Sequence, residues 1–269
     1  MNPRTVLILG MHRSGTSLMA NWLQSCGLNI GENLLVGDSF SNPNGHFEDL
    51  DFLKLHQELL IQSGVYQSGI DPSAIDPIVL NQESINRIKS LLNKKQESII
   101  SWGWKDPRSV LFINTYDILL PNALFIVLYR NPYEVVNSLY KRDLKVLTKS
   151  HTSEKIGFYS YIKTYFKTLL GKPSIRAKYL KVWVNYNRIL ISQLKDKVPE
   201  KVLFVNIKDI QKKDSGIIKW LNLRGANLRF RPLDDFFIME KLNKTNQRVT
   251  KSFALDLYKE LDLYSNKSI

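Results

Sequence analysis

With 269 residues, 43% of them hydrophobic and 11% aromatic, the chain has the composition of a globular protein and not of a disordered one. Its single cysteine, Cys26, excludes an intramolecular disulfide, and the apolar segment at its N-terminus is too short for a signal peptide or a membrane span. The net charge of +13 comes from residues 141–213, where 18 Lys and Arg stand against 5 Asp and Glu, because the remainder holds 20 of each. We therefore expect one cytoplasmic domain over residues 1–269.

The first predicted element is a strand over Val6–Leu9, a short apolar run that contains β-branched residues. Residues 10–15 are small and polar, and apolar residues then recur at helical spacing. A helix is therefore expected to begin at residues 14–16 and to end near Gly27. A strand, a glycine loop and a helix N-terminus form an anion site, because the loop N–H groups and the positive end of the helix dipole converge there.

The glycines of this loop have the spacing of a phosphate-binding P-loop, since Gly10 and Gly15 are five residues apart. The lysine that P-loop nucleotide triphosphatases carry is missing, because Thr16 takes its place. An arginine, Arg13, lies inside the loop instead. A phosphate-binding loop with an arginine is our interpretation, and a tight strand-to-helix turn without a ligand is the alternative.

A long loop over residues 28–47 follows the first helix and leads into Glu48. Loops of this length inside a compact domain are usually functional or disordered. Apolar residues at helical spacing then predict a second helix over residues 52–60 and a third over residues 85–92. Glu48 thus lies between a long loop and a helix that should border a cleft.

Two further strands are predicted at residues 98–104 and 123–129, and the second is a near-continuous apolar run, which is typical of a central parallel strand. The first strand leads into Lys105 and the sequence Asp-Pro-Arg. The second is followed by Arg130 and by a proline in the first turn of a helix over residues 133–140.

The rest of the chain adds one strand and several helices. They are expected at residues 110–119, over most of 141–197 with a break at 171–173, at 202–205 (the strand), at 215–223 and at 250–263. Strands that alternate with helices predict an α/β fold with a central parallel sheet flanked by helices. The basic helical segment in the C-terminal half favours a polyanionic ligand, nucleic acid or an anionic membrane surface, with a solvated lysine-rich surface as the alternative.

Polar residues follow three of the predicted strands: residues 10–17, residues 105–108, and Arg130 with Ser138. Because ligands bind at the carboxyl ends of the strands in open α/β sheets, we expect these stretches to converge. Ser138 lies about two helical turns beyond Arg130, so the two side chains can hold a phosphate through charge-assisted hydrogen bonds. Taken alone, Ser138 would be interpreted as a solvent-facing helix serine.

The two loops together resemble the donor site of the sulfotransferases. Gly-Met-His-Arg-Ser-Gly-Thr-Ser-Leu resembles their 5′-phosphosulfate loop, and Tyr-Arg-Asn-Pro-Tyr-Glu-Val-Val-Asn-Ser resembles their 3′-phosphate motif. Gly-His-Phe-Glu and Trp-Gly-Trp-Lys-Asp-Pro-Arg look most like bacterial members with carbohydrate or other small-molecule acceptors. The resemblance covers residues 4–140. It implies a P-loop sulfotransferase fold, the donor 3′-phosphoadenosine 5′-phosphosulfate (PAPS) and no metal.

The resemblance also implies which residues hold the donor, namely His12, Arg13, Ser14, Gly15, Thr16, Ser17, Arg130, Ser138 and Arg248. Backbone amides and hydroxyls of the loop would bind the 5′-phosphosulfate, and Arg13 would neutralise charge on the bridging oxygen as the sulfuryl group leaves. Arg130 and Ser138 would hold the 3′-phosphate. Arg248 would also reach the nucleotide, although the glycine-rich lysine motif of cytosolic members is absent.

Sulfuryl transfer needs a base for the acceptor proton and a cation near the sulfuryl oxygens. The histidine base of the cytosolic sulfotransferases has no clear counterpart here, so Glu48 is the candidate base, with Glu32 and Asp49 as competitors. Lys105 is the candidate second cation, positioned by the Asp-Pro-Arg sequence that follows it. A helix N-terminal charge at Glu48, and a structural ion pair within Asp-Pro-Arg, are the alternatives.

Two other functions are weighed against this one. A P-loop kinase of small molecules would need Mg²⁺ and the missing loop lysine. A protein that binds polyanions without catalysis would use residues 141–213, but no nucleic-acid recognition motif accompanies them, so a nucleic-acid partner is not expected. The expected partners are PAPS, a hydroxyl acceptor that is a saccharide or an anionic molecule, and an anionic membrane surface as a peripheral contact. The sequence does not give the acceptor, because acceptor pockets are built by variable loops.

Overall fold

The computed structural model describes residues 4–37, 45–96, 101–153, 172–233 and 252–268. Four strands form a parallel sheet with the order β2-β1-β3-β4. They are β1 (Thr5–Leu9), β2 (Trp102–Lys105), β3 (Leu124–Tyr129) and β4 (Val202–Asn206). In the register of the sheet, Val6 lies between Gly103 of β2 and Leu124 of β3. The predicted parallel α/β sheet is confirmed.

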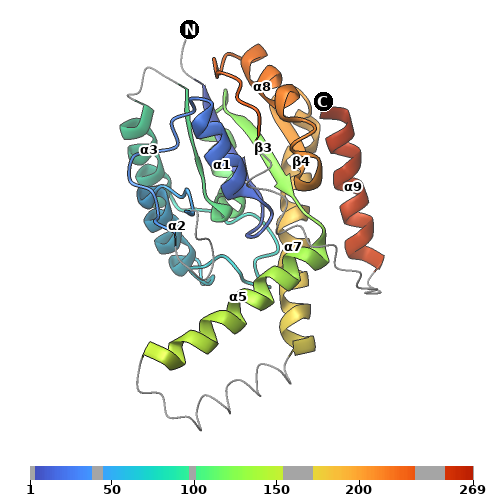
Figure 1. Cartoon of the computed structure of the whole chain (residues 1–269). Coiled ribbons are helices and arrows are strands. Elements are labelled where there is room, and N and C mark those ends of the chain that lie inside the picture. Colours follow the sequence, from blue (N-terminus) through green and yellow to red (C-terminus); the bar gives the residue numbers. More distant parts are fainter. Residues whose placement is uncertain (1–3, 38–44, 97–100, 154–171, 234–251, 269) are drawn as a thin grey trace.

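Helices cover both faces of this sheet, with α1 in front of the strands and α7 behind them in Figure 1. The front face carries α1 (Thr16–Ser25) and α8 (Asp214–Leu223). The core behind the sheet is completed by α2 (Leu50–Gln62), α3 (Gln82–Gln96), the 3₁₀ helix η1 (Pro107–Phe112), α4 (Ile113–Leu119), α5 (Pro132–Ser153), α7 (Lys172–Leu194) and α9 (Ser252–Ser268). Two short 3₁₀ helices, η2 (Lys195–Lys197) and η3 (Ile207–Asp209), flank β4. None of the helices in the described part of the chain combines the length and the hydrophobicity that crossing a bilayer requires.

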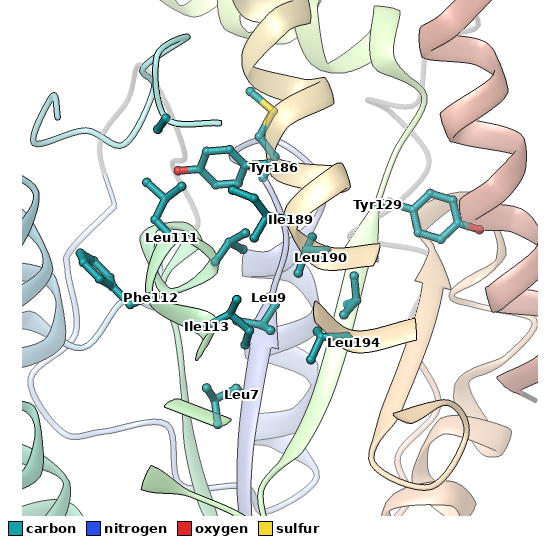
Figure 2. Close-up of a cluster of buried hydrophobic side chains, with 14 of the residues drawn as sticks. Leu7, Leu9, Leu111, Phe112, Ile113, Tyr129, Tyr186, Ile189, Leu190 and Leu194 are labelled. Carbon is teal, nitrogen blue, oxygen red and sulfur yellow. The ribbon is translucent and has the colours of Figure 1, made fainter. Parts of the chain in front are cut away.

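Alternate residues of β1 point to opposite faces of the sheet, as in any strand. Leu7 and Leu9 belong to the larger buried cluster, which Figure 2 shows beside Leu190 and Leu194 of α7. Val6, on the other face, belongs to the cluster formed with α1 and α8. Because both faces are buried, the four residues Val6–Leu9 are all apolar. This is the reason that the strand appears in the sequence as a continuous apolar run and not as an alternating one.

Several elements differ from their predicted bounds. The helix α3 extends beyond the predicted 85–92, and the sequence does not indicate the added turns, because they are polar and carry little hydrophobic periodicity. The helices predicted at 133–140 and from 141 onward are one continuous helix, α5. The predicted helix at 110–119 is divided into η1 and α4. Its first part is a tight 3₁₀ turn, which begins where the Asp106 side chain accepts the N–H of Arg108. Residues 98–100, 154–171 and 234–251 lie outside the described residues.

The carboxyl ends of the strands meet at one edge of the sheet, below the centre of Figure 1. The chain passes from β1 to β2 on one side and then to β3 on the other, so the direction of the strand order changes at β1. Open α/β sheets bind their ligands at such a switch point. Figure 1 shows α5 leaving the end of β3 and crossing below this edge toward the side of α2.

Candidate active site

The loop between β1 and α1 takes its shape from two glycines. Gly10 and Gly15 have φ angles of 147° and 95°, which L-residues rarely adopt. A Cβ on Gly10 would lie 2.3 Å from the carbonyl oxygen of Leu128, and a Cβ on Gly15 would lie 2.2 Å from Cδ1 of Ile207. Both distances are far below van der Waals contact. The loop is therefore pressed against the ends of β3 and β4 and has room only for glycine at these positions.

The N-terminus of α1 is open to an anion. The helix begins at Thr16, and its N-cap residue, Gly15, has no side chain that could accept the N–H groups of the first turn. Ser14, in the same loop, is 1% exposed, and its hydroxyl has no hydrogen-bond partner among the described residues. Leaving a buried hydroxyl unpaired costs about 1–3 kcal/mol, which a bound anion would recover. The loop therefore fits a phosphate or sulfate group.

Arg13 connects this loop to α5. Its backbone has a left-handed φ of 70°, and its Nε donates a hydrogen bond to Oγ of Ser138 at 2.9 Å. The structure thus joins the arginine of the first motif to the serine of the second. Arg130, after the end of β3, donates from Nε to Oε2 of Glu134 at 2.7 Å. The remaining residue of the predicted donor set, Arg248, lies outside the described residues.

A cavity of about 360 Å³ lies at the carboxyl edge of the sheet. The predicted site residues that line it are His12, Arg13, Thr16, Ser17, Glu48 and Lys105. The hydroxyl of Ser17 donates to the carbonyl of His46 at 3.1 Å and so holds the segment before Glu48 against α1. In the part of the chain that the structure describes, no three His, Cys, Asp or Glu side chains are grouped as metal ligands.

Glu48 and Lys105 form a buried ion pair on the wall of this cavity. Nζ of Lys105 lies 2.7 Å from Oε1 of Glu48, and Nη1 of Arg108 lies 3.3 Å from Oε2. Glu48 is 5% exposed and Lys105 is 1% exposed. Burial lowers the pKa of the Lys105 ammonium, while the charge and hydrogen bond of Glu48 oppose this shift. Glu48 therefore faces the cavity with both of its oxygens held by cations.

The two competing carboxylates lie elsewhere. Asp49 is the N-cap of α2, where Oδ1 accepts the N–H of Asp51 at 2.9 Å and Oδ2 accepts from Nζ of Lys95 at 2.7 Å. Glu32 is exposed and does not line the cavity. Of the three carboxylates considered from the sequence, Glu48 is the one on the cavity wall.

A buried chain of hydrogen bonds supports Arg108 from behind. Oδ1 of Asp106 accepts from Nη1 of Arg108 at 2.8 Å, and Oδ2 lies 2.7 Å from Nδ1 of His56. Nε2 of His56 lies 2.5 Å from the hydroxyl of Tyr116. The carboxylate thus fixes a proton on Nδ1, and in the neutral ring Tyr116 donates to Nε2. Although burial opposes it, Arg108 and His56 hold the pKa of the Asp106 carboxyl well below its usual range. Asp106 accordingly positions Arg108.

His12 ties the loop to the segment after α2. Its Nε2 donates to the carbonyl of Ser68 at 3.0 Å, because a carbonyl oxygen can only accept. Burial lowers the pKa of His12 well below its usual value, and the positive charge of Arg108 adds to this effect. His12 is therefore neutral at pH 7, with Nδ1 unprotonated. The sequence assigns His12 to the donor loop. It does not predict that His12 is also a group beside the cavity, in addition to Glu48, that can accept a proton.

The outer wall of the cavity is not predicted from the sequence. It consists of Tyr66 in the loop after α2, Arg142 and Asp143 of α5, and Lys178 and Tyr179 of α7. Arg142 lies four residues beyond Ser138, so the two share a face of α5, and this spacing is a signal that could have found it. No such local signal exists for the α7 residues, because the packing of α7 against α5 decides their position.

Comparisons with known proteins agree with this geometry. A family model described as "Sulfotransferase family" matches residues 3–171. The fold is similar to the sulfotransferase domain of the olefin synthase from Synechococcus PCC 7002, with 15% identity, a TM-score of 0.52, and 97% of this chain and 95% of that chain covered. It is also similar to a sulfotransferase from Alicyclobacillus acidocaldarius, with 11% identity, a TM-score of 0.51, and 100% and 98% covered. No curated protein sequence matches the chain.

Proposed function

The chain belongs to the sulfotransferase family, and we propose that it transfers the sulfuryl group of PAPS to a hydroxyl of a carbohydrate or another small molecule. The observation that carries this proposal is the 2.9 Å hydrogen bond from Arg13 to Ser138. It joins a P-loop without lysine to the helix that follows β3. This arrangement suits a donor with one anionic group at its 5′ end and another on the 3′ position of its ribose.

In this proposal each of the two motifs binds a different part of the donor. The N–H groups at the start of α1, the hydroxyls of Thr16 and Ser17, and the unpaired hydroxyl of Ser14 bind the phosphosulfate. Arg130 and Ser138 bind the 3′-phosphate. Arg130 already forms an ion pair with Glu134, so a 3′-phosphate has to share or displace this carboxylate.

The reaction forms a bond between the acceptor oxygen and sulfur while the bond from sulfur to the bridging oxygen breaks. The bonding electrons move to that oxygen, and 3′-phosphoadenosine 5′-phosphate (PAP) leaves. Arg13 stabilises the negative charge that develops there, and Lys105 stabilises the sulfuryl oxygens. Glu48 takes the acceptor proton. Protonation of Glu48 weakens its 2.7 Å bond to Lys105, and the ammonium can then follow the charge on the sulfuryl group.

Titration with PAP, with ATP–Mg²⁺ and with DNA tests the donor class directly. PAP should bind without a metal. Arg130→Ala should weaken PAP binding by about 1.5–3 kcal/mol, as expected for a hydrogen bond to a charged group, and should affect adenosine 5′-phosphosulfate much less. Equal losses for both nucleotides would make Arg130 structural. Binding of ATP–Mg²⁺ in place of PAP would support the kinase alternative.

Arg13 is tested by separating binding from turnover. If its contact strengthens only in the transition state, Arg13→Ala should lower kcat far more than donor affinity. Arg13→Lys should retain part of the activity, because a lysine also places a cation beside the bridging oxygen. Loss of donor binding with unchanged turnover would remove Arg13 from the mechanism.

A further inference from the structure

The cavity is more basic than the transfer step requires. Among its lining residues the cationic side chains outnumber the acidic ones, with Arg13, Lys105, Arg108, Arg142 and Lys178 against Glu48 and Asp143. The donor and the Glu48 cluster account for the first three cations. Arg142 and Lys178, both in the outer wall, have no part in that chemistry.

Arg142 is held in place but keeps a donor for a ligand. It donates from Nε and Nη2 to Oδ1 of Asp143, at 3.1 and 3.0 Å. The hydroxyl of Tyr179 donates to the other oxygen of this carboxylate. Both carboxylate oxygens of Asp143 thus accept hydrogen bonds, one from α5 and the other from α7. Nη1 of Arg142 has no hydrogen-bond acceptor among the residues that the structure describes.

Lys178 is positioned by an aromatic ring and not by a carboxylate. Its Nζ lies 5.0 Å from the centre of the Tyr66 ring, and Tyr66 is 58% exposed. Within the described ranges, no carboxylate lies within ion-pair distance of Lys178. The carboxylate of Asp71, in the same loop as Tyr66, is occupied by the N–H groups of Tyr66 and Ser73 at 3.1 and 2.9 Å. The positive charge of Lys178 contributes to the lowered pKa of Asp71, but the ammonium forms no ion pair with it and remains available at the cavity mouth.

These two cations lie on the acceptor side of the cavity. The residues proposed for the 3′-phosphate, Arg130 and Ser138, are not among those that line it. The phosphosulfate is assigned to the loop at the start of α1, whereas Lys178 comes from α7 and Arg142 from α5, one turn beyond Ser138. A ligand that contacts Arg142 and Lys178 is thus more easily the acceptor than the donor.

We propose that the acceptor carries an anionic group, a carboxylate, sulfate or phosphate, which binds between Lys178 and Arg142 while its hydroxyl reaches Glu48. This inference rests on the proposed sulfuryl transfer. It also gives the basic segment of the chain a function, because both cations come from residues 141–213, where the charge excess is concentrated. An ammonium and a guanidinium group together bind such oxyanions by charge-assisted hydrogen bonds.

The test measures binding to the protein saturated with PAP, by calorimetry. The probes are 4-nitrophenyl β-D-glucuronide and 4-nitrophenyl β-D-glucoside, which differ in a carboxylate, and a 6-sulfated glucoside, which separates sulfate from carboxylate. We expect at least one anionic glycoside to bind roughly tenfold more tightly than the neutral one. This preference should decline as salt is added, because the outer wall is open to solvent.

Matched variants assign the preference to its residue. Lys178→Met should abolish it and Lys178→Arg should keep it. Lys181→Met, which removes an exposed lysine one turn further along α7, should leave it unchanged. Equal affinity of all three glycosides, which includes no detectable binding of any, overturns the inference, and so does a preference that survives Lys178→Met. Because PAP is titrated first, a protein that binds PAP but does not discriminate refutes only this inference. A protein that binds no PAP refutes the proposed function itself.

Discussion

Replacement of Glu48 by glutamine should slow sulfuryl transfer by roughly 10²- to 10⁴-fold and leave PAP affinity unchanged. Glutamine keeps the shape of the side chain and offers Lys105 an oxygen acceptor, but it cannot take the acceptor proton. The rate loss corresponds to about 3–5 kcal/mol in the activation free energy.

The structure also sets the expected cost in stability. Glu48 accepts one charge-assisted hydrogen bond at 2.7 Å from Lys105 and a weaker one at 3.3 Å from Arg108. Glutamine converts the first into a bond to a neutral oxygen, which lowers the free energy of unfolding by about 1–2 kcal/mol. For a chain of this size the Tm should fall by about 2–8 °C. The variant therefore remains folded at 25 °C, where the rate is measured.

The assay is a single turnover with labelled PAPS and a glycoside that the wild-type protein sulfates. Glu32→Gln is the matched control, because Glu32 is exposed and does not line the cavity, and its rate should stay close to that of the wild type. A Glu48→Gln rate within tenfold of the wild type would refute the assignment. So would a loss of PAP affinity equal to the loss of rate. In either case His12, with Nδ1 unprotonated, becomes the next candidate base.

Three further predictions concern the framework of the site. Tyr116→Phe leaves the buried Nε2 of His56 without its hydrogen-bond partner and should lower the free energy of unfolding by about 1–3 kcal/mol in urea denaturation, whereas no change would contradict the hydrogen bond. His12 has a lowered pKa in the folded state, so the unfolded chain binds more protons below about pH 6.5 and stability should fall as the pH drops from there. His12→Asn should flatten this part of a Tm–pH profile, and an unchanged slope would refute the contribution of His12. Gly15→Ala places a methyl group against Ile207 at a residue with positive φ. The variant should lose about 1–3 kcal/mol of unfolding free energy, measured by thermal unfolding, and should also lose PAP binding. A variant with the Tm of the wild type would contradict this prediction.

The glycine loop at residues 10–15 and its place in the fold could be predicted because their signals are local. The strand at Val6–Leu9, the glycine loop and the helix from Thr16 follow each other within a few residues. The rule that ligands bind at the carboxyl ends of parallel strands then brings Lys105 and Arg130 to the same edge of the sheet. Burial of both sheet faces made β1 and β3 easy to find, since both consist mainly of a run of apolar residues.

The partners within the site could not be predicted, because they are far apart in sequence. Glu48 and Lys105 are separated by 57 residues, and the sequence suggests a base and a cation at these positions but not their ion pair. His56 is an unremarked residue in an amphipathic helix pattern until α2 brings it to Asp106, 50 residues away. Lys178 reaches the cavity only because α7 packs beside α5. Each contact depends on helix packing, which hydrophobic periodicity does not specify.

The tight seating of the donor loop has a consequence for the order in which the protein is made. Gly10 and Gly15 rest on Leu128 and Ile207, so a loop near the start of the chain is moulded by residues that are translated much later. At about 5–20 residues per second, roughly 10–40 seconds pass between the synthesis of Gly15 and that of Ile207. During this interval the nascent chain lacks one of the surfaces that give the loop its shape. Nucleotide binding should thus begin only when most of the polypeptide has left the ribosome, and unfinished chains would not sequester the donor.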